Sequence, residues 1–305
     1  MSNSILVTGS SGLVGGALVS ALSSIGVRVT QLDIRAMDLA RGDVRDRERV
    51  FQAMAGVDGV VHLAAVSRVI WGEQDPDQCW STNVGGLRNV LDLAAGSSAP
   101  PWVIFASSRE VYGQPDQLPA DEDSPRQPVN VYGRTKVEGE QLVVAAQHRG
   151  VRACTIRLSN VFGTTTDHED RVVPAFARGA LLGRELRVDG ADNTFDFTHI
   201  DDVTRGIMSL AERLGRSVEL PPPIHFVSGV PTTLGELARA AIRIAGSNSR
   251  IRTAPPREFD VARFVGSPAR AEEWLGWRPH VSLEAGLTRL IHEFRAGAAA
   301  TEASR

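Results

Sequence analysis

The stretch Thr8–Gly15, TGSSGLVG, decides the fold, because three glycines join a short apolar run to a helical pattern. Gly9 permits a tight turn, Gly12 lets the backbone approach a pyrophosphate, and Gly15 lets helix and strand pack closely. The free N–H groups at the start of the helix favour phosphate. The stretch therefore predicts a dinucleotide-binding loop. Its remaining cofactor-lining residues are expected to be Ser11, Leu13 and Val14.

Outward from this loop, β-branched runs alternate with helical patterns. The runs that predict buried strands are Ser4–Thr8, Val27–Asp33, Val57–Leu63, Trp102–Ser107 and Arg152–Leu158. The patterns that predict helices between them are Gly12–Ile25, Arg47–Ala55, Asn83–Ala95 and Tyr132–Arg149. Strict alternation implies right-handed βαβ units and a parallel sheet with helices on both faces. The expected fold class is α/β, a Rossmann-type doubly wound parallel sheet.

The second half of the chain has a different pattern. Prolines interrupt it, and predicted helices such as Leu234–Ala245 and Leu283–Ala296 are separated by irregular stretches. We interpret it as a smaller C-terminal α/β substrate lobe. The expected domains are a Rossmann domain over 1–160, which also receives segments around 195–215, and a substrate lobe over 161–296. Residues 297–305 are small and polar, which predicts a disordered tail.

The composition excludes several classes of protein. A formal charge of -3 over 305 residues gives no basic surplus for nucleic acid or an anionic membrane. Two cysteines, Cys79 and Cys154, are too few for a disulfide framework or a metal site, so we expect packing roles and no metal. The start of the sequence lacks the pattern of a signal peptide and no apolar run is long enough to span a membrane, so we expect neither. The expected location is the cytoplasm.

Asp33 points to the choice of cofactor. It ends the second predicted strand, where a carboxylate accepts hydrogen bonds from an adenosine ribose and repels a 2′-phosphate. NAD is therefore expected, although nearby Arg35 keeps NADP open. Asp43 and Val44 are expected beside the adenine. The residues expected to line the cofactor from the next strand end are Leu63, Ala64 and Ala65.

Tyr132 and Lys136 are four residues apart at the start of a predicted helix, so their side chains share one face. The ordinary tyrosine pKa of about 10 is too high for a base at neutral pH. A neighbouring ammonium and a positive nicotinamide ring would lower it. Ser108 lies at a predicted strand end, where open α/β sheets bind ligands. Together these residues predict a proton-transfer group.

Taken together, eight stretches resemble the nucleotide-sugar epimerase/dehydratase family of extended short-chain dehydrogenases/reductases over nearly the whole chain. They are TGSSGLVG, HLAA, TNVGG (82–86), SSREVYG (107–113), YGRTK (132–136), RLSNVFG (157–163), FDFTHIDDV (195–203) and LGWRP (275–279). The resemblance implies that Ser108, Tyr132 and Lys136 are catalytic. It also implies that Asn160 contacts the substrate diphosphate and that Arg257 and Asp260 line the nucleotide-sugar pocket. We further expect Asn83 at the cofactor and Ser67 at the substrate.

In this family the tyrosine takes a proton from a sugar hydroxyl, usually at C4, while hydride passes to NAD. The keto sugar is then epimerised, dehydrated or decarboxylated. Sugar 4,6-dehydratases carry Thr-Asp-Glu where this chain has Ser108, Arg109 and Glu110, so Glu110 remains a candidate base. Arg109 cannot replace the acidic Asp, because its pKa stays above about 12. It could instead form a structural ion pair with Glu110 or bind a uronate carboxylate.

Phe195 is a second departure, because the family commonly has an arginine there that pairs with the diphosphate. Loss of this arginine is expected to weaken the binding of a nucleoside diphosphate. Arg171, Arg187 or Arg257 could compensate for it.

The leading hypothesis is an NAD+-dependent C4 epimerase of nucleotide sugars. The alternatives are a 4,6-dehydratase or uronate decarboxylase using Glu110, a simple NAD(P)H-exchanging reductase, or a non-catalytic NAD-binding protein. A homodimer through helices Asn83–Ala95 and Tyr132–Arg149 is also expected, although their apolar residues could equally pack on the sheet.

Overall fold

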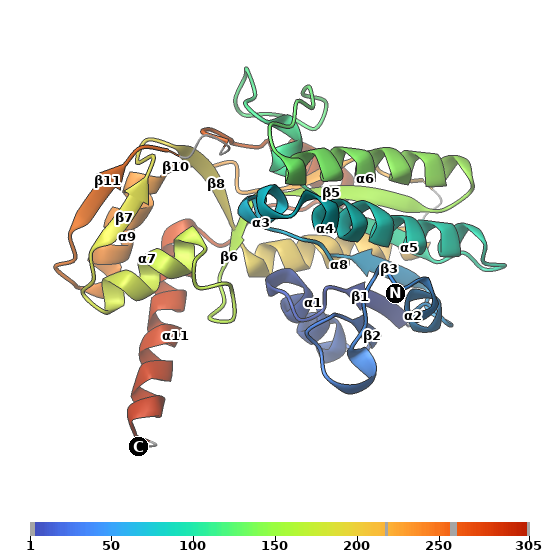
Figure 1. The fold of residues 1–305 in the computed structure, drawn as a ribbon, viewed down its shortest axis with the longest axis horizontal. Coiled ribbons are helices and arrows are strands. Elements are labelled where there is room, and N and C mark those ends of the chain that lie inside the picture. Colours follow the sequence, from blue (N-terminus) through green and yellow to red (C-terminus); the bar gives the residue numbers. More distant parts are fainter. Residues whose placement is uncertain (1–3, 217–218, 257–260, 304–305) are drawn as a thin grey trace.

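The computed structural model describes residues 4–216, 219–256 and 261–303. The expected pocket residues Arg257 and Asp260 therefore lie outside the described part of the chain. A parallel sheet of six strands in the order β2-β1-β3-β4-β5-β9 forms its centre (Figure 1). Its strands are β1 Ser4–Thr8, β2 Arg28–Leu32, β3 Gly59–His62, β4 Trp102–Ser108, β5 Ala153–Leu158 and β9 Ile224–Phe226. The expected Rossmann-type α/β fold is confirmed.

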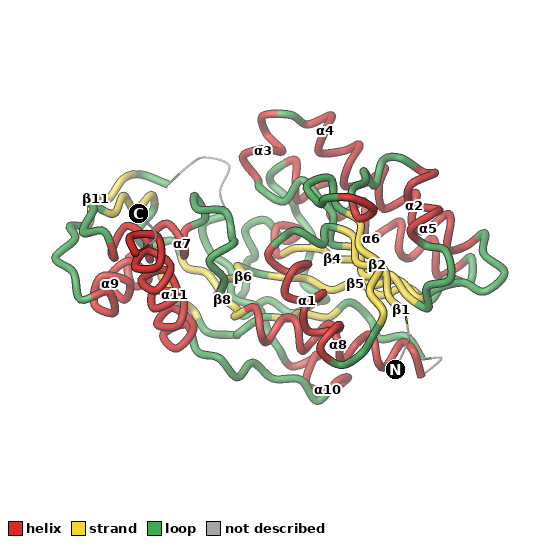
Figure 2. The backbone as a smooth tube through the Cα atoms, turned by 90° about the horizontal axis from the view of Figure 1, so that it is seen from below, coloured by secondary structure: helices red, strands yellow, loops and turns green. Residues whose placement is uncertain are grey.

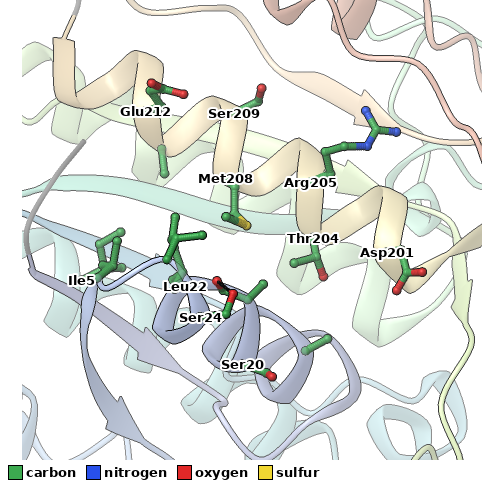
Figure 3. A pocket seen from close by; sticks show the side chains of 15 residues that line it. Ile5, Ser20, Leu22, Ser24, Asp201, Thr204, Arg205, Met208, Ser209 and Glu212 are labelled. Atoms are coloured by element: carbon green, nitrogen blue, oxygen red, sulfur yellow. Dashed lines mark hydrogen bonds between the residues drawn. The ribbon is translucent and has the colours of Figure 1, made fainter.

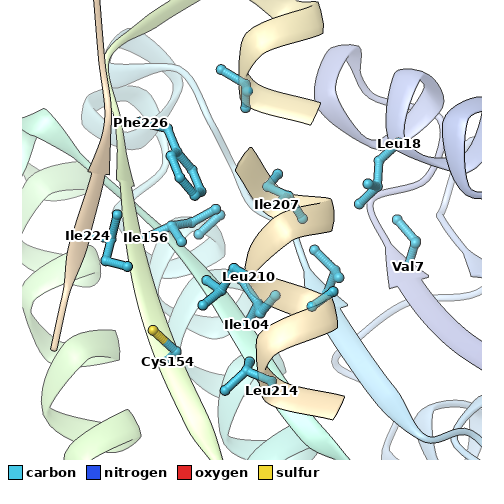
Figure 4. Close-up of a cluster of buried hydrophobic side chains, with 14 of the residues drawn as sticks. Val7, Leu18, Ile104, Cys154, Ile156, Ile207, Leu210, Leu214, Ile224 and Phe226 are labelled. Atoms are coloured by element: carbon cyan, nitrogen blue, oxygen red, sulfur yellow. The ribbon is translucent and has the colours of Figure 1, made fainter. Parts of the chain in front are cut away.

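Helices cover both faces of this sheet. Helices α1 (Leu13–Ser24) and α8 (Ile200–Arg216) contact each other and share one apolar core with the sheet (Figure 4). The opposite core is formed with α2 (Arg47–Ala53), α5 (Gly86–Ala95) and α6 (Val131–His148). Both cysteines are free and buried, as expected of packing residues.

The elements of the C-terminal lobe, which are three helices and two small sheets, gather at one end of the molecule, beside the main sheet (Figure 2). Helices α7 (Val172–Leu181), α9 (Leu234–Ala245) and α11 (Leu283–Ala303) share a third apolar core. Two small sheets accompany them, of order β10-β8-β6 and β11-β7. Their strands are β6 Asn160–Phe162, β7 Leu186–Asp189, β8 Thr194–His199, β10 Pro231–Thr233 and β11 Ile251–Ala254. Their packing against the sheet creates the cleft described below.

The remaining elements are short. They are η1 Asp38–Ala40, α3 Val69–Gln74, α4 Pro76–Trp80, η2 Ser81–Gly85, η3 Arg109–Tyr112 and α10 Ala269–Leu275. Helix α11 differs from expectation, because it continues to Ala303 where a disordered tail was predicted from residue 297. The run of alanines at 298–300 explains this, since alanine has the highest helix propensity. In the described ranges, no helix is both long enough and apolar enough to cross a membrane.

Candidate active site

A cleft of about 500 Å³ opens where the carboxyl ends of the strands face the C-terminal elements. Most predicted site residues line it. They are Gly9, Gly12, Leu13, Val14, Gly15, Leu63, Ala65, Ser67, Ser108, Arg109, Glu110, Tyr132, Lys136, Asn160 and Phe195. A second hollow lies between α1 and α8 (Figure 3) and contains no predicted site residue. The candidate chemistry therefore belongs to the first cleft.

The glycine loop fits a dinucleotide diphosphate. Gly9 has a φ of 71°, and a Cβ at Gly15 would lie 2.1 Å from the carbonyl oxygen of Gly9. No side chain larger than glycine can therefore occupy position 15 without moving the backbone. Helix α1 follows Gly12, which caps the helix without a side-chain hydrogen bond. Its first N–H groups thus stay available to phosphate oxygens.

Asp33 is held beside this loop. Its carboxylate is buried and accepts hydrogen bonds from the backbone N–H of Ser11, at 3.0 Å, and of Arg35, at 2.7 Å. Arg35 Nε lies 3.6 Å from the same carboxylate, and half of the arginine side chain is exposed. The geometry suits a ribose diol, because each carboxylate oxygen keeps further accepting capacity.

Asp43, Val44 and Ala64, three residues expected at the cofactor, are not among those that line the cleft. Asp43 pairs with Arg45 at 2.6 Å, and the hydrogen bond from Arg45 holds the pKa of Asp43 below its ordinary value. Val44 is buried against Gly86, and the N–H of Ala64 donates to Thr8 Oγ1. The cofactor contacts of Asp43, Val44 and Ala64 stay predictions.

Asn83 does not line the cleft either, and it joins two segments. Its Oδ1 accepts from the N–H of Val66 at 2.7 Å, and its Nδ2 donates to Thr135 Oγ1 at 3.0 Å. Asn83 thereby fixes the loop after β3 against α6, the helix that carries Tyr132 and Lys136. Its cofactor contact remains a prediction.

Ser108, Tyr132 and Lys136 meet at the base of the cleft. Ser108 ends β4 and hydrogen-bonds the Tyr132 hydroxyl, while Tyr132 and Lys136 lie in the first turns of α6. Lys136 Nζ donates to the Ala106 carbonyl at 2.8 Å and lies 5.5 Å from the centre of the Tyr132 ring. The three side chains therefore line the same part of the cleft.

Burial shifts the pKa of both titratable groups. It raises the pKa of Tyr132 to about 12, and the hydrogen bond with Ser108 opposes this shift without reversing it. It lowers the pKa of Lys136 from 10.5 to about 8. The expected lowering of the tyrosine pKa is thus absent from the protein alone, because the desolvation of a phenolate outweighs its neighbours.

Lys136 is the only lysine of the chain, which has 33 lysines and arginines in all. Arginine therefore supplies the positive charge at every other position. An arginine cannot lose its proton in a protein, whereas a buried lysine can. Its being the only lysine singles out Lys136 without any motif. The prediction of Lys136 had rested on its spacing from Tyr132 and on the family resemblance, and had not used this signal.

Arg109 and Phe195, the two departures from the family pattern, contact each other. The guanidinium carbon of Arg109 lies 4.5 Å from the centre of the Phe195 ring, and its Nη2 pairs with Glu110 Oε1 at 2.9 Å. The other carboxylate oxygen of Glu110 accepts from Asn130 Nδ2 at 2.8 Å. Both oxygens of Glu110 are therefore engaged, which limits its use as a base.

Sequence reasoning also missed Arg68, Asp167 and Asp170, which line the cleft. Arg68, just before α3, forms an ion pair with Asp170. The rings of Trp71 and His168 meet edge to face, with 5.1 Å between their centres. On the same segment, Asp167 is buried, and burial raises the pKa of its carboxyl. A polar run after the RLSNVFG stretch, TTTDHEDR at 164–171, was the available signal. Metal-type clusters of three His, Cys, Asp or Glu do not occur among the described residues.

Comparisons with known proteins agree with this geometry. The model of the NAD dependent epimerase/dehydratase family matches residues 5–220. A UDP-glucose 4-epimerase of Streptomyces lividans is 30% identical, with 92% of each chain covered.

Solved structures extend the agreement to the fold. MoeE5 in complex with UDP-glucuronic acid and NAD has a TM-score of 0.89 at 25% identity, covering 96% of this chain and 99% of that one. UDP-glucose 4-epimerase of Thermus thermophilus in complex with NAD has a TM-score of 0.86 at 28% identity, with the same coverage. These findings confirm the expected cofactor, NAD. Because the family model and these relatives match most of its length, the chain belongs to the NAD-dependent epimerase/dehydratase family of extended short-chain dehydrogenases/reductases.

Proposed function

We propose that this protein epimerises a nucleotide sugar at C4 and that Tyr132 is the catalytic base. The observation that carries the proposal is the meeting of Ser108, Tyr132 and Lys136 beside the glycine loop. A sugar hydroxyl placed between Ser108 and Tyr132 would lie where a proton can leave. A non-catalytic NAD-binding protein would have no need for this arrangement.

In the proposed reaction, Tyr132 takes the proton of the C4 hydroxyl and Ser108 hydrogen-bonds the same oxygen. NAD, which the glycine loop and Asp33 would hold, would supply the hydride acceptor for C4 and, once the keto sugar has turned over, the hydride donor to its opposite face. The positive charge of Lys136 lies 5.5 Å from the centre of the Tyr132 ring, where it would favour the phenolate over the neutral phenol. The tyrosine then returns its proton to the oxygen at C4.

Dehydration and decarboxylation are the alternatives, and the contacts of Glu110 disfavour the proton abstraction at C5 that dehydration needs. A carboxylate that acts as a base at C5 must be basic, whereas the charged Arg109 and the amide of Asn130 each stabilise one oxygen of the ionised Glu110. Arg109 also cannot donate a proton to a leaving hydroxyl.

Product analysis tests the reaction. The purified protein is incubated with UDP-glucose, UDP-glucuronate and dTDP-glucose, and the products are followed by NMR. We expect a C4 epimer with every oxygen and carbon retained. A product that lacks O6 or the C6 carboxylate contradicts epimerisation.

The two tyrosines of the chain provide a matched pair for the catalytic step. Tyr132→Phe is expected to lower kcat by about 10²- to 10⁴-fold, the usual contribution of general acid–base catalysis. Tyr112 is buried beside Arg157 and His225, away from the cleft lining, so Tyr112→Phe should cost stability instead. Unchanged turnover of Tyr132→Phe would refute the assignment.

We also propose a homodimer and a cytoplasmic location. The buried apolar residues of α5 and α6 pack on the sheet, but Val144 on α6 is 50% exposed and available to a second copy. Light scattering of Val144→Glu beside the unmodified protein tests the dimer, which the substitution should dissociate. Fractionation of the source cells tests the location.

A further inference from the structure

We propose that Arg109 binds a carboxylate of the substrate, so that the sugar is a uronate with its carboxylate on the carbon next to the reacting carbon. The inference rests on the function proposed above and narrows it to one class of sugar. Arg109 directly follows Ser108 and lines the same cleft as Tyr132.

The position of Arg109 places its charge at the sugar end of the cleft. The backbone N–H of Glu110, the next residue, donates to Ser108 Oγ at 3.2 Å. The turn that carries Arg109 therefore begins at Ser108, the residue proposed to bind the C4 hydroxyl of the sugar. The substituent at C5 is one carbon away from C4, whereas the diphosphate is attached across the ring at C1. A side chain on this turn therefore meets the substituents next to C4, among them that at C5, before it meets the diphosphate.

The guanidinium is held in a geometry that suits a carboxylate. The guanidinium carbon lies over the Phe195 ring, 4.5 Å from its centre, which leaves the N–H groups to find acceptors elsewhere. Glu110 Oε1 pairs with Nη2 of Arg109 at 2.9 Å. Planar forks of this kind recognise carboxylates through paired N–H groups.

One nitrogen of Arg109 remains without an acceptor. Its Nη1 is buried and has no hydrogen-bond partner within residues 4–216, 219–256 and 261–303. The side chain is 13% exposed, so this charge is largely removed from water. A buried N–H group without an acceptor is unfavourable, and a ligand carboxylate that meets the guanidinium supplies the missing oxygen. A neutral hydroxymethyl group at the same carbon would offer this nitrogen only an uncharged acceptor.

Binding measurements with three ligands test the inference. Affinities for UDP, UDP-glucose and UDP-glucuronate are measured by calorimetry for the NAD-bound protein and for Arg109→Gln. We expect the unmodified protein to prefer UDP-glucuronate over UDP-glucose. Arg109→Gln should weaken UDP-glucuronate by about 10- to 100-fold more than UDP-glucose, as expected for a charged hydrogen bond.

Control variants separate a specific contact from general effects. Arg187 lines the same cleft and is largely exposed, so Arg187→Gln should change the three affinities by one common factor. Phe195→Leu removes the stacked ring and should reduce the preference for UDP-glucuronate in part. Arg109→Lys, which keeps the charge but loses the fork, should give an intermediate preference. Melting temperature and bound NAD confirm that each variant is folded.

The outcomes are distinguishable. Equal weakening of all three ligands by Arg109→Gln would assign the guanidinium to the diphosphate and overturn the inference. A preference of the unmodified protein for UDP-glucose would overturn it as well, while leaving C4 epimerisation standing. Failure of the protein to bind any of the three ligands would refute the proposed function itself.

Discussion

Ser107 Oγ donates a hydrogen bond to Glu140 Oε1 at 2.6 Å, which joins the strand that presents Ser108 to the helix that presents Tyr132 and Lys136. Arg157 on β5 binds both oxygens of the same carboxylate, at 2.8 and 2.7 Å. Burial alone would raise the pKa of Glu140, but its bonds to Arg157 hold it below the ordinary value. One buried carboxylate thus positions both halves of the catalytic group.

Glu140→Ala should therefore destabilise the fold by about 3–5 kcal/mol, because it leaves the buried Arg157 guanidinium without its partner. Glu138→Ala on the same helix removes a partly exposed carboxylate and should change stability by less than about 0.5 kcal/mol. Urea unfolding followed by circular dichroism measures both. Equal effects of the two substitutions would mean that the ion pair contributes no specific stability.

Gly15 and Gly16 should respond in opposite ways to alanine. In Gly15→Ala the Cβ meets backbone atoms of the cofactor loop at 2.1 Å, so less NAD should co-purify and the melting temperature should fall. In Gly16→Ala the nearest atom is 3.7 Å away, and helix propensity should stabilise α1 by about 1 kcal/mol. Chromatography of the nucleotide released on denaturation, together with thermal melting, checks this. A normal NAD content in Gly15→Ala would contradict the loop assignment.

The single lysine allows its pKa to be measured directly. In protein labelled with ¹³C-lysine, one side-chain resonance is expected, with a midpoint at about pH 8 instead of 10.5. The unfolded chain keeps this proton up to about pH 10.5 while the folded chain releases it near pH 8. Raising the pH through this window should therefore stabilise the unmodified protein relative to Lys136→Met. A midpoint near 10.5 would mean that Lys136 is solvated and not buried.

Asp33→Asn should lower NAD affinity by about 10- to 100-fold, because the ribose loses a charged acceptor. The same change should improve NADP relative to NAD, since Arg35 remains beside the loop and the repelling carboxylate is gone. Asp38→Asn, an exposed neighbour on η1, is the matched control and should leave both affinities unchanged. Calorimetric titration with each nucleotide measures the ratio, and an unaltered ratio in Asp33→Asn would remove Asp33 from cofactor selection.

Local sequence was sufficient for the framework of this protein. The glycine loop, five of the six strands of the main sheet, the helices between them and the spacing of Tyr132 and Lys136 were all predictable. Each depends on residues that are neighbours in the chain, through hydrophobic periodicity or the need for glycine. Strand β9 was not predictable, because it has three residues, follows a run of prolines and is defined only by pairing with β5.

Tertiary structure decided which side chains meet around the reacting group. Sequence alone offered an ion pair with Glu110 as one reading of Arg109 and did not connect Arg109 with Phe195, whereas folding places Arg109 over the Phe195 ring. This contact joins η3 to β8, which are distant in sequence. The sequence by itself therefore determined the cofactor loop and the proton-transfer pair, which are local. The charge available to the sugar was decided only by the packing of distant segments, because burial and partners exist only once those segments meet.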